Sequence, residues 1–253
     1  MTERGMIFNG EMVRAILDGR KTQTRRIMKV QPKPSKSRPG DFWFSSKKLE
    51  SMVHVSDLAP GNSPIADYHL FIQEHCCPFG AVGDRIWVRE TFQGPLVHEE
   101  LFEEYSAYPE KFETPEYCEY AADGGVRPEY CDLEDNLRHG WRPSIHMPRW
   151  ASRILLEITN VRVERLNAIS EEDAQREGVH TEVWDQTVVA RNYAARDEFF
   201  QFWSEDMPHY VEMNQLYRSS FRSLWESIYG AENWLANPWV WVIEFKRVEG
   251  GAA

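Results

Sequence analysis

The sequence lacks the features of a membrane-spanning or exported protein. None of its apolar runs approaches the roughly 18 residues that a transmembrane helix needs. The opening residues, MTERGMIFNG, contain no apolar core of the kind found in signal peptides. We therefore expect a cytoplasmic protein with no membrane partner.

Cysteine is scarce, and the chain has no CxxC pair. Two of the four cysteines, Cys76 and Cys77, are adjacent, which strains any simple disulfide scheme. Together with His75, Cys118 and Cys131 they would supply the ligand types that zinc prefers. Free buried thiols are nevertheless the favoured interpretation, so we expect neither a metal nor an organic cofactor.

Net positive charge is also missing, because 29 Lys and Arg residues stand against 40 Asp and Glu residues, a formal net charge of -11. Such a chain is poorly suited to broad, charge-driven binding of duplex nucleic acid. The charge is uneven, however: residues 14–48 are mainly basic and residues 99–135 are mainly acidic. Either the basic stretch forms a local anion site, or both stretches are solvated surfaces that partly neutralise each other.

No internal repeat is visible, and the predicted elements are separated by long irregular stretches. Apolar spacing and turn residues predict helices at 11–18, 170–178, 194–203 and 215–229, and strands at 24–30, 85–91, 153–166 and 239–248. The intervening stretches 31–80, 93–140 and 180–213 are interpreted as insertions into a single domain over 1–253. Short strands without regular βαβ alternation predict an α+β fold with a small mixed or antiparallel barrel.

A polar turn, GRKTQTRR, follows the first predicted helix. Asn9 fits the N-cap of that helix and Gly19 fits the position after its last turn. A threonine hydroxyl becomes nucleophilic when a base removes its proton, and a lysine can be that base once burial or nearby cations lower its pKa. Lys21 and Thr24, with the neighbouring arginines, supply these groups, although the same composition also suits an ordinary solvated turn.

The helix predicted at 170–178 carries a carboxylate at its end. Ser170 and Asp173 have the spacing of a capping box, and Gly178 is expected to stop the helix. Glu177 then lies at the negative end of the helix dipole, which disfavours a charged carboxylate. A carboxylic acid that protonates a departing amine would complete an amide-cleaving set with a lysine and a threonine.

Aromatic residues are frequent, and three of them stand among lysines in the first insertion. Phe42, Trp43 and Phe44 would suit base stacking in single-stranded nucleic acid. A hydrophobic anchor that holds down a loop is the favoured interpretation. In the last predicted strand, Val240 and Val242 should face the side opposite to the alternating aromatic residues.

The turn GRKTQTRR matches the G-x-K-x-x-[E/T]-x-R signature of the ASCH domain, a PUA-like β-barrel family linked to RNA and nucleotide binding, and the chain resembles that family. Three further segments occur in the order that the family would require: GDRIWV, a helix with A-x-x-E, and WVIEFK. The resemblance covers residues 6–30, 83–92, 147–179 and 225–248. It implies a PUA-like small mixed β-barrel with flanking helices.

ASCH proteins that hydrolyse N(4)-acetylcytidine carry Thr at the variable motif position, as this chain does. The resemblance implies that Lys21 is the proton acceptor, Thr24 the nucleophile and Glu177 the proton donor. The segments MPRWASRI and GDRIWVRET are similar to the longer ASCH proteins of phages and prophages. The predicted function is therefore an amidohydrolase acting on an N-acylated cytidine-type nucleoside or nucleotide.

Five further residues are predicted to bind the substrate: Arg26, Arg25, Glu90, Trp87 and Trp150. Arg26 would orient the carboxylate or bind an anion, and the tryptophans would stack on the base. The main alternative is a non-catalytic RNA- or modified-base-binding module, in which the cations of the turn contact phosphate. A ribonuclease would use the same cations to stabilise a phosphorane. The expected partner is a small nucleoside or nucleotide, with single-stranded RNA as the alternative.

Overall fold

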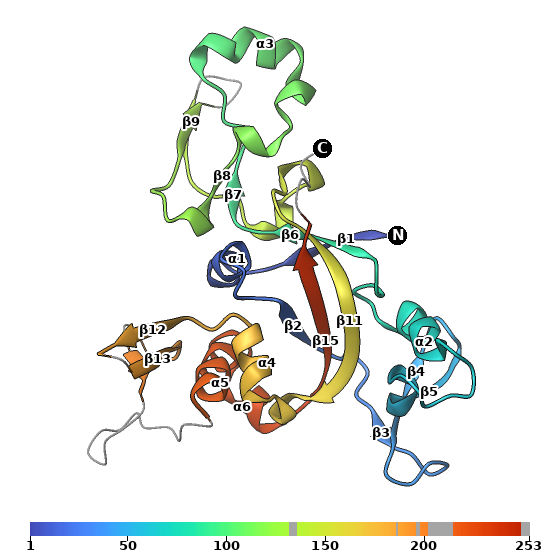
Figure 1. Cartoon of the computed structure of the whole chain (residues 1–253). Helices are drawn as coiled ribbons and strands as arrows, with labels where there is room; N and C mark the ends of the chain where they lie inside the picture. Colours follow the sequence, from blue (N-terminus) through green and yellow to red (C-terminus); the bar gives the residue numbers. More distant parts are fainter. Residues whose placement is uncertain (132–135, 186, 196–197, 202–214, 249–253) are drawn as a thin grey trace. The chain divides into compact units, whose positions relative to one another are not determined.

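The computed structural model describes residues 1–131, 136–185, 187–195, 198–201 and 215–248 (Figure 1). In these ranges the protein is a mixed α+β fold with six α-helices and several β-sheets. None of the helices in the described ranges combines the length and the apolar character that crossing a membrane requires. The chain divides into two compact units: Met1–Leu17, Gly83–Glu157 and Lys246–Ala253 form the first, and Asp18–Val82 and Ile158–Phe245 form the second.

The first unit is built on β1 (Glu3–Ile7), which pairs in parallel with β6 (Arg85–Arg89). The start of β11 (Leu155–Arg165) pairs antiparallel with β6, and α1 (Gly10–Leu17) follows β1. The predicted alternation of β6 is confirmed, because Ile86 and Val88 are buried while Arg85, Trp87 and Arg89 are half-buried. Smaller elements follow β6: β7 (Phe92–Gln93), α3 (Phe102–Ala107), β8 (Glu119–Tyr120), β9 (Glu129–Cys131) and β10 (Leu137–His139).

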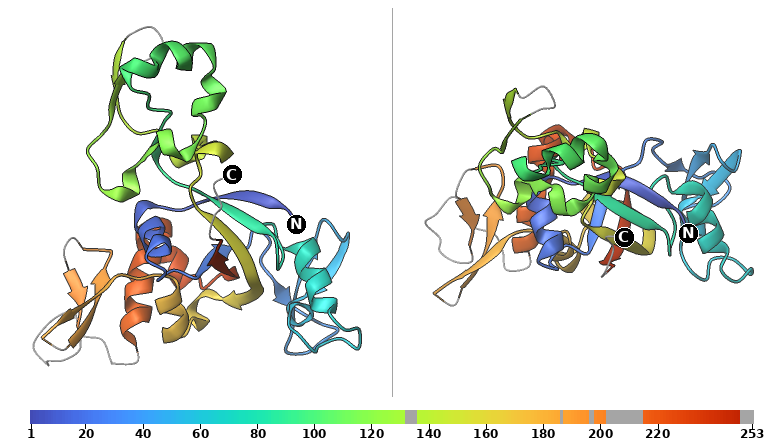
Figure 2. Two further views of the ribbon diagram at one scale, coloured as in Figure 1. Left: turned by 45° about the horizontal axis from the view of Figure 1, so that its top comes forward. Right: turned by 90° about the horizontal axis from the view of Figure 1, so that it is seen from above.

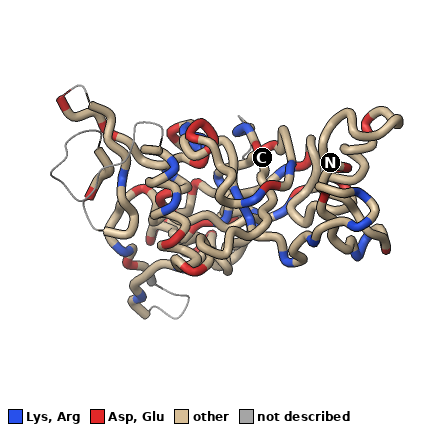
Figure 3. Tube along the Cα trace, turned by 90° about the horizontal axis from the view of Figure 1, so that it is seen from below, with Lys and Arg blue, Asp and Glu red and all other residues tan. Residues whose placement is uncertain are grey.

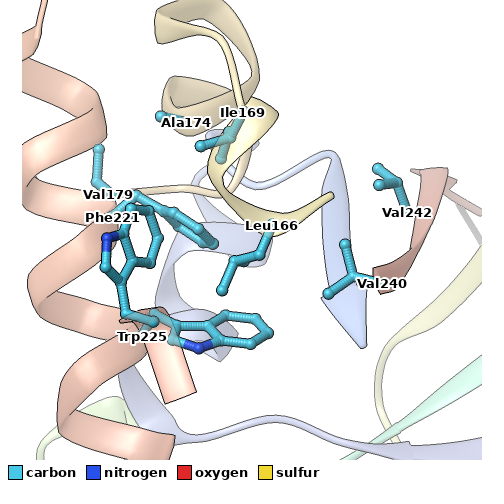
Figure 4. Packing of buried hydrophobic residues seen from close by; sticks show 9 residues of the cluster. Leu166, Ile169, Ala174, Val179, Phe221, Trp225, Val240 and Val242 are labelled. Carbon is cyan, nitrogen blue, oxygen red and sulfur yellow. The ribbon is translucent and has the colours of Figure 1, made fainter. Parts of the chain in front are cut away.

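The second unit is built on the remainder of β11, which neighbours β15 (Trp239–Arg247), and β15 pairs antiparallel with β2 (Gln23–Ile27). Three helices complete this part of the unit: α4 (Glu171–Arg176), α5 (Leu216–Tyr229) and α6 (Ala231–Leu235). Their apolar faces form one core with β15 (Figure 4), whose buried members are Leu166, Ile169, Ala174, Val179, Phe221, Trp225, Trp234, Val240 and Val242. The predicted facing of Val240 and Val242 is thereby confirmed.

Two small sheets belong to the second unit as well. In one, β4 (Phe42–Ser46) lies between β3 (Lys33–Pro34) and β5 (Ser51–His54), and α2 (Tyr68–Cys76) follows. In the other, β13 (Thr187–Asn192) lies between β12 (Thr181–Trp184) and β14 (Glu198–Phe200). Helix α5 stands between α4 and this second sheet (Figures 1 and 2).

The predicted helix ends are confirmed by their caps. The Asn9 side chain accepts a hydrogen bond from the Met12 backbone N–H at 2.8 Å, and the Ser170 hydroxyl accepts one from the Asp173 N–H at 3.1 Å. Gly178 has a φ of +84°, a conformation that an L-residue adopts only with strain, and α4 ends just before it. Local signals therefore fixed the helix that carries Glu177.

Two sequence predictions differ from the structure. The helix predicted at 194–203 is wrong over Glu198–Phe200, which form β14, and residues 196–197 and 202–203 lie outside the described ranges. Pairing with β13 decides the conformation there, and the Phe199 ring packs 4.9 Å from that of Trp184. The stretch 31–80, interpreted as an insertion or loop, contains a complete three-stranded sheet and a helix.

The anchor interpretation of the aromatic group in β4 is confirmed for two of its rings. Phe42 packs 4.9 Å from Trp239, and Phe44 packs edge-on at 6.0 Å from Trp241. The small sheet is thus held against β15. The main-sheet strands run in the order β1-β6-β11-β15-β2, and no closed barrel is detected among the described strands.

Candidate active site

Lys21 lies in the turn just before β2, in the second unit. The backbone of Thr22 fixes this turn, because its N–H donates to the Arg176 carbonyl at 2.9 Å and its carbonyl accepts from the Phe245 N–H at 2.8 Å. The Lys21 side chain is 0% exposed. Its Nζ donates to Glu177 Oε2 at 2.8 Å and to the Glu177 carbonyl at 2.9 Å. The amine of the polar turn and the carboxylate at the end of α4 are therefore in direct contact.

Glu177 caps the C-terminus of α4 and its side chain is only 2% exposed. A carboxylate at this end of a helix is unfavourable by itself. Two cations compensate, since Lys21 binds Oε2 and the Arg25 Nη1 donates to Oε1 at 3.0 Å. Lys21 also satisfies a carbonyl that the end of the helix leaves unpaired. The sequence places Glu177 at the negative end of the helix dipole, and the two cations Lys21 and Arg25 stabilise its carboxylate there.

Arg25 extends this contact into a larger network of ion pairs. Its Nη2 donates to Asp173 Oδ2 at 2.9 Å and to Glu164 Oε2 at 3.1 Å, and its side chain is 0% exposed. Arg162 binds the same Asp173 oxygen at 2.8 Å and also pairs with Glu164 and Glu244. Basic and acidic residues are interspersed along the trace (Figure 3). We call the set Lys21, Arg25, Arg162, Glu164, Asp173, Glu177 and Glu244 the ion network; Lys21, Arg25 and Glu177 form its buried part, and Arg162, Glu164 and Glu244 are about a quarter exposed.

The surroundings change the pKa values of three members of the ion network, Lys21, Asp173 and Arg162; although burial opposes the shift, the carboxylates around Arg162 raise its pKa. Burial lowers the pKa of Lys21, against the opposing effect of Glu177, and the charges of Arg26 and Arg25 lower it further. Burial raises the pKa of Asp173, but the charges of Arg25 and Arg162 outweigh it, so that this pKa lies below its ordinary value. The lowered pKa makes the neutral, proton-accepting form of Lys21 more populated at a given pH than in an ordinary lysine.

Thr24 is placed differently from Lys21. It lies within β2, where successive side chains alternate between the two faces of the sheet. Gln23 and Arg25 face α4, as their bonds to Asp173 show, so Thr24 and Arg26 face the other way. Thr24 is 2% exposed, and in the described ranges its hydroxyl makes no hydrogen bond to Lys21 or to Glu177. The structure thus brings together two of the three residues to which catalytic roles were assigned.

The remaining predicted site residues lie in the first unit and make their contacts there. Glu90 is 1% exposed and binds Arg153 side-on, with Nε–Oε1 at 3.0 Å and Nη2–Oε2 at 3.1 Å. Burial raises the pKa of Glu90, although Arg153 opposes the shift. The ring of Trp87 lies 2.6 Å from the point where Gly5 would carry a Cβ, so it covers that backbone. Trp150 is half-buried and packs against a small hydrophobic cluster formed by Phe92, Tyr120, Met147 and Ala151.

The network contains residues that sequence reasoning did not assign to the site. Asp173 and Glu177 are four apart on α4, which is the spacing of side chains on one helical face. This i, i+4 pair was a usable signal. Arg162 and Glu164 are two residues apart on β11 and share one face of the sheet, but nothing local indicates that Glu164 meets Arg25 or that Arg162 meets Asp173. Among the described residues, no group of three or more His, Cys, Asp or Glu side chains could hold a metal ion.

Comparisons with known proteins do not assign the chain to a family. No protein-family model matches the chain, and neither a curated protein nor a solved structure matches it. A functional assignment therefore depends on the residues of the site and on the motif resemblance.

Proposed function

We propose that the protein is an amidohydrolase that removes an acyl group from an N-acylated cytidine-type nucleoside or nucleotide, in the cytoplasm, on a PUA-like framework. The observation that carries the proposal is the contact between the Lys21 amine and the Glu177 carboxylate, both almost fully buried. An amine with a lowered pKa beside a carboxyl group supplies a proton acceptor and a proton donor 2.8 Å apart. The fit of GRKTQTRR to the ASCH signature supports the same assignment.

In the proposed reaction, a proton first passes from the Lys21 ammonium to Glu177 across their hydrogen bond, and Thr24 Oγ1 then attacks the acyl carbonyl while the neutral Lys21 amine takes the hydroxyl proton. The C–N bond then breaks, and Glu177 gives its proton to the departing exocyclic amine, which leaves an ester on Thr24 and free cytidine. Lys21 returns the proton to Glu177 across their hydrogen bond. Water cleaves the ester, releasing the carboxylic acid and restoring the Thr24 hydroxyl.

The nucleophile must reach the amine from the opposite face of β2. A general base acts over about 3 Å, directly or through one water. Arg26 shares the face of Thr24, and its charge is nevertheless near enough to lower the pKa of Lys21. A charge acts over many ångströms, so this effect does not itself bring Thr24 to the amine, and the reaction requires Thr24 to reach Lys21 through a water or a local rearrangement.

The burial and neutralisation of the cations argue against the nucleic-acid alternatives, and the proposed reaction itself needs an opening through which the substrate amine reaches Glu177, which is 2% exposed. The side chains of Lys21 and Arg25 are 0% exposed and are neutralised by Glu177, Asp173 and Glu164. A phosphate group could pair with them only by displacing these carboxylates, at the cost of several kcal/mol per buried ion. A binding module or a ribonuclease would instead need cations that phosphate can reach.

The test is to incubate the purified protein with N(4)-acetylcytidine and follow cytidine release by chromatography. We expect Lys21→Met, Thr24→Val and Glu177→Gln each to lower kcat by at least about 100-fold, since members of one catalytic unit fail together. Thr22→Val is the matched control, because the Thr22 side chain is exposed and only its backbone holds the turn. A wild type that is inert on acylated cytidines, or a Thr24→Val rate equal to that of Thr22→Val, would overturn the proposal.

A further inference from the structure

The carboxylate of Glu177 is held by a different cation at each oxygen. Lys21 donates to Oε2 at 2.8 Å, and Arg25 donates to Oε1 at 3.0 Å. Two donors on separate oxygens fix the rotation of the carboxylate plane as well as its position. The Arg25 contact therefore determines which oxygen of Glu177 faces the Lys21 amine.

Arg25 is itself held rigidly. While Nη1 binds Glu177, Nη2 binds Asp173 at 2.9 Å and Glu164 at 3.1 Å, and the guanidinium carbon lies 5.9 Å from the centre of the Phe221 ring. Asp173 and Glu177 belong to the same face of α4, so one guanidinium ties β2 to that helix at two points. A lysine at this position would carry the charge, but it lacks the planar fork that spans both carboxylates.

The same contacts exclude a direct role in binding the substrate, which is the role that the sequence suggested for Arg25. Its side chain is 0% exposed, and three carboxylates surround its two terminal nitrogens. A ligand could reach Arg25 only after Asp173, Glu164 or Glu177 had moved away. Any effect of Arg25 on turnover must then pass through the groups that it holds.

We infer that Arg25 is a positioning residue that holds the Glu177 carboxylate on the Lys21 amine and acts on the reaction only through Glu177. The inference rests on the proposed function for its kinetic consequences, but not for the contact itself. Loss of the fork leaves Glu177 free to rotate, and a misplacement of about 1 Å in a catalytic group can cost about 100-fold in rate. Substrate affinity should be unaffected, because Arg25 does not meet the substrate.

The kinetic test compares Arg25→Gln, Arg25→Lys and the surface control Arg222→Gln, whose side chain is 51% exposed. We expect Arg25→Gln to lower kcat about 100-fold with KM changed less than about twofold, and Arg25→Lys to recover about a tenth of the wild-type kcat. In a Glu177→Gln background, Arg25→Gln should change kcat by less than about twofold, since its target is already gone. An equal loss of kcat in both backgrounds, or a loss confined to KM, would overturn the inference.

A second readout does not need turnover. Brief acylation of lysines with acetic anhydride, read by peptide mass spectrometry, should label Lys21 about 10-fold faster in Arg25→Gln than in wild type, because a released carboxylate uncovers the amine. Arg222→Gln should leave that rate unchanged. If wild type proves inert on acylated cytidines, the proposed reaction fails, and the labelling alone decides the inference. Unchanged Lys21 labelling in both Arg25→Gln and Arg25→Lys would refute it.

Discussion

Breaking the Lys21–Glu177 pair should destabilise the protein far more than breaking an exposed ion pair. The two side chains are 0% and 2% exposed, so neither charge can be rehydrated once its partner is removed. Removing one partner of a buried pair typically costs about 3–5 kcal/mol. In Glu177→Gln the amide oxygen and the backbone carbonyl still accept from Lys21, and Arg25 keeps two carboxylates. The free energy of unfolding should therefore fall by about 3 kcal/mol.

The reciprocal change should cost about the same. Lys21→Met keeps the length of the side chain and removes the charge, while Glu177 retains Arg25 on its other oxygen. We expect a loss of about 3 kcal/mol for this variant as well. The double variant leaves neither charge unpaired, so its loss should also lie near about 3 kcal/mol rather than about 6, a coupling free energy of about 3 kcal/mol.

Urea unfolding at pH 7, followed by tryptophan fluorescence, measures these free energies in one thermodynamic cycle. The control is Arg222→Gln, which breaks the exposed i, i+4 pair with Glu226 on α5 and should cost no more than about 0.5 kcal/mol. Additive losses in the double variant, or a loss below about 1 kcal/mol for Glu177→Gln, would show that the two groups are not a desolvated pair.

Three further predictions concern other contacts. The folded-state pKa of Lys21 is lowered below 10.5, so between the lowered value and 10.5 the unfolded chain binds more protons than the folded chain. Stability should therefore rise with pH through that interval by up to about 1.4 kcal/mol per pH unit. Urea titrations of wild type should show this slope, and Lys21→Met should lack it. Gly94→Ala should lower stability by about 1–3 kcal/mol in the same assay, because its Cβ would meet Cys118 Sγ at 2.5 Å. Glu90→Gln should cost about 2–4 kcal/mol, since it breaks the side-on pair with Arg153, and Glu90→Asp, which keeps the charge, should cost less.

The elements that sequence reasoning predicted correctly are those specified by local chemistry. Asn9 and Ser170 cap their helices by hydrogen bonds to residues three positions away, and such bonds depend on no distant part of the chain. Alternation along β15 is equally local, and it correctly separated Val240 and Val242 from the aromatic residues. The positions of Lys21 and Glu177 on a turn and at a helix end followed from these signals.

The elements that were missed depend on pairing between distant segments. Strand β14 exists because it pairs with β13, and its sequence alone suggested a helix. The sheet within 31–80 was hidden by Pro, Ser and Lys residues, and its β4 is anchored through Phe42 on Trp239, almost two hundred residues away. No window of the sequence contains either contact.

The site shows the same division. Sequence comparison with a motif selected Lys21 and Glu177, but it gave no reason for the chain to tolerate two buried charges there. That reason lies in Glu164 and Asp173, which bind Arg25 from β11 and α4, and in Arg162, which binds Asp173 in turn. A buried charge costs several kcal/mol unless it is paired, so the pair at the site requires the rest of the network. A motif names the reacting groups, whereas the residues that make their burial possible are visible only in three dimensions.

The relation of Lys21 to Thr24 is decided by the backbone between them. In a regular antiparallel strand the N–H and the carbonyl of one residue point to the same neighbour, and side chains three residues apart face opposite sides. Thr22 breaks this rule, because its N–H bonds to Arg176 in α4 while its carbonyl bonds to Phe245 in β15. The side chain of Lys21 still faces α4 together with those of Gln23 and Arg25, as strand alternation predicts, so Thr24 faces the other way. The K-x-x-T spacing therefore cannot by itself place the amine beside the hydroxyl, and the geometry at Thr22 sets how near the two can come.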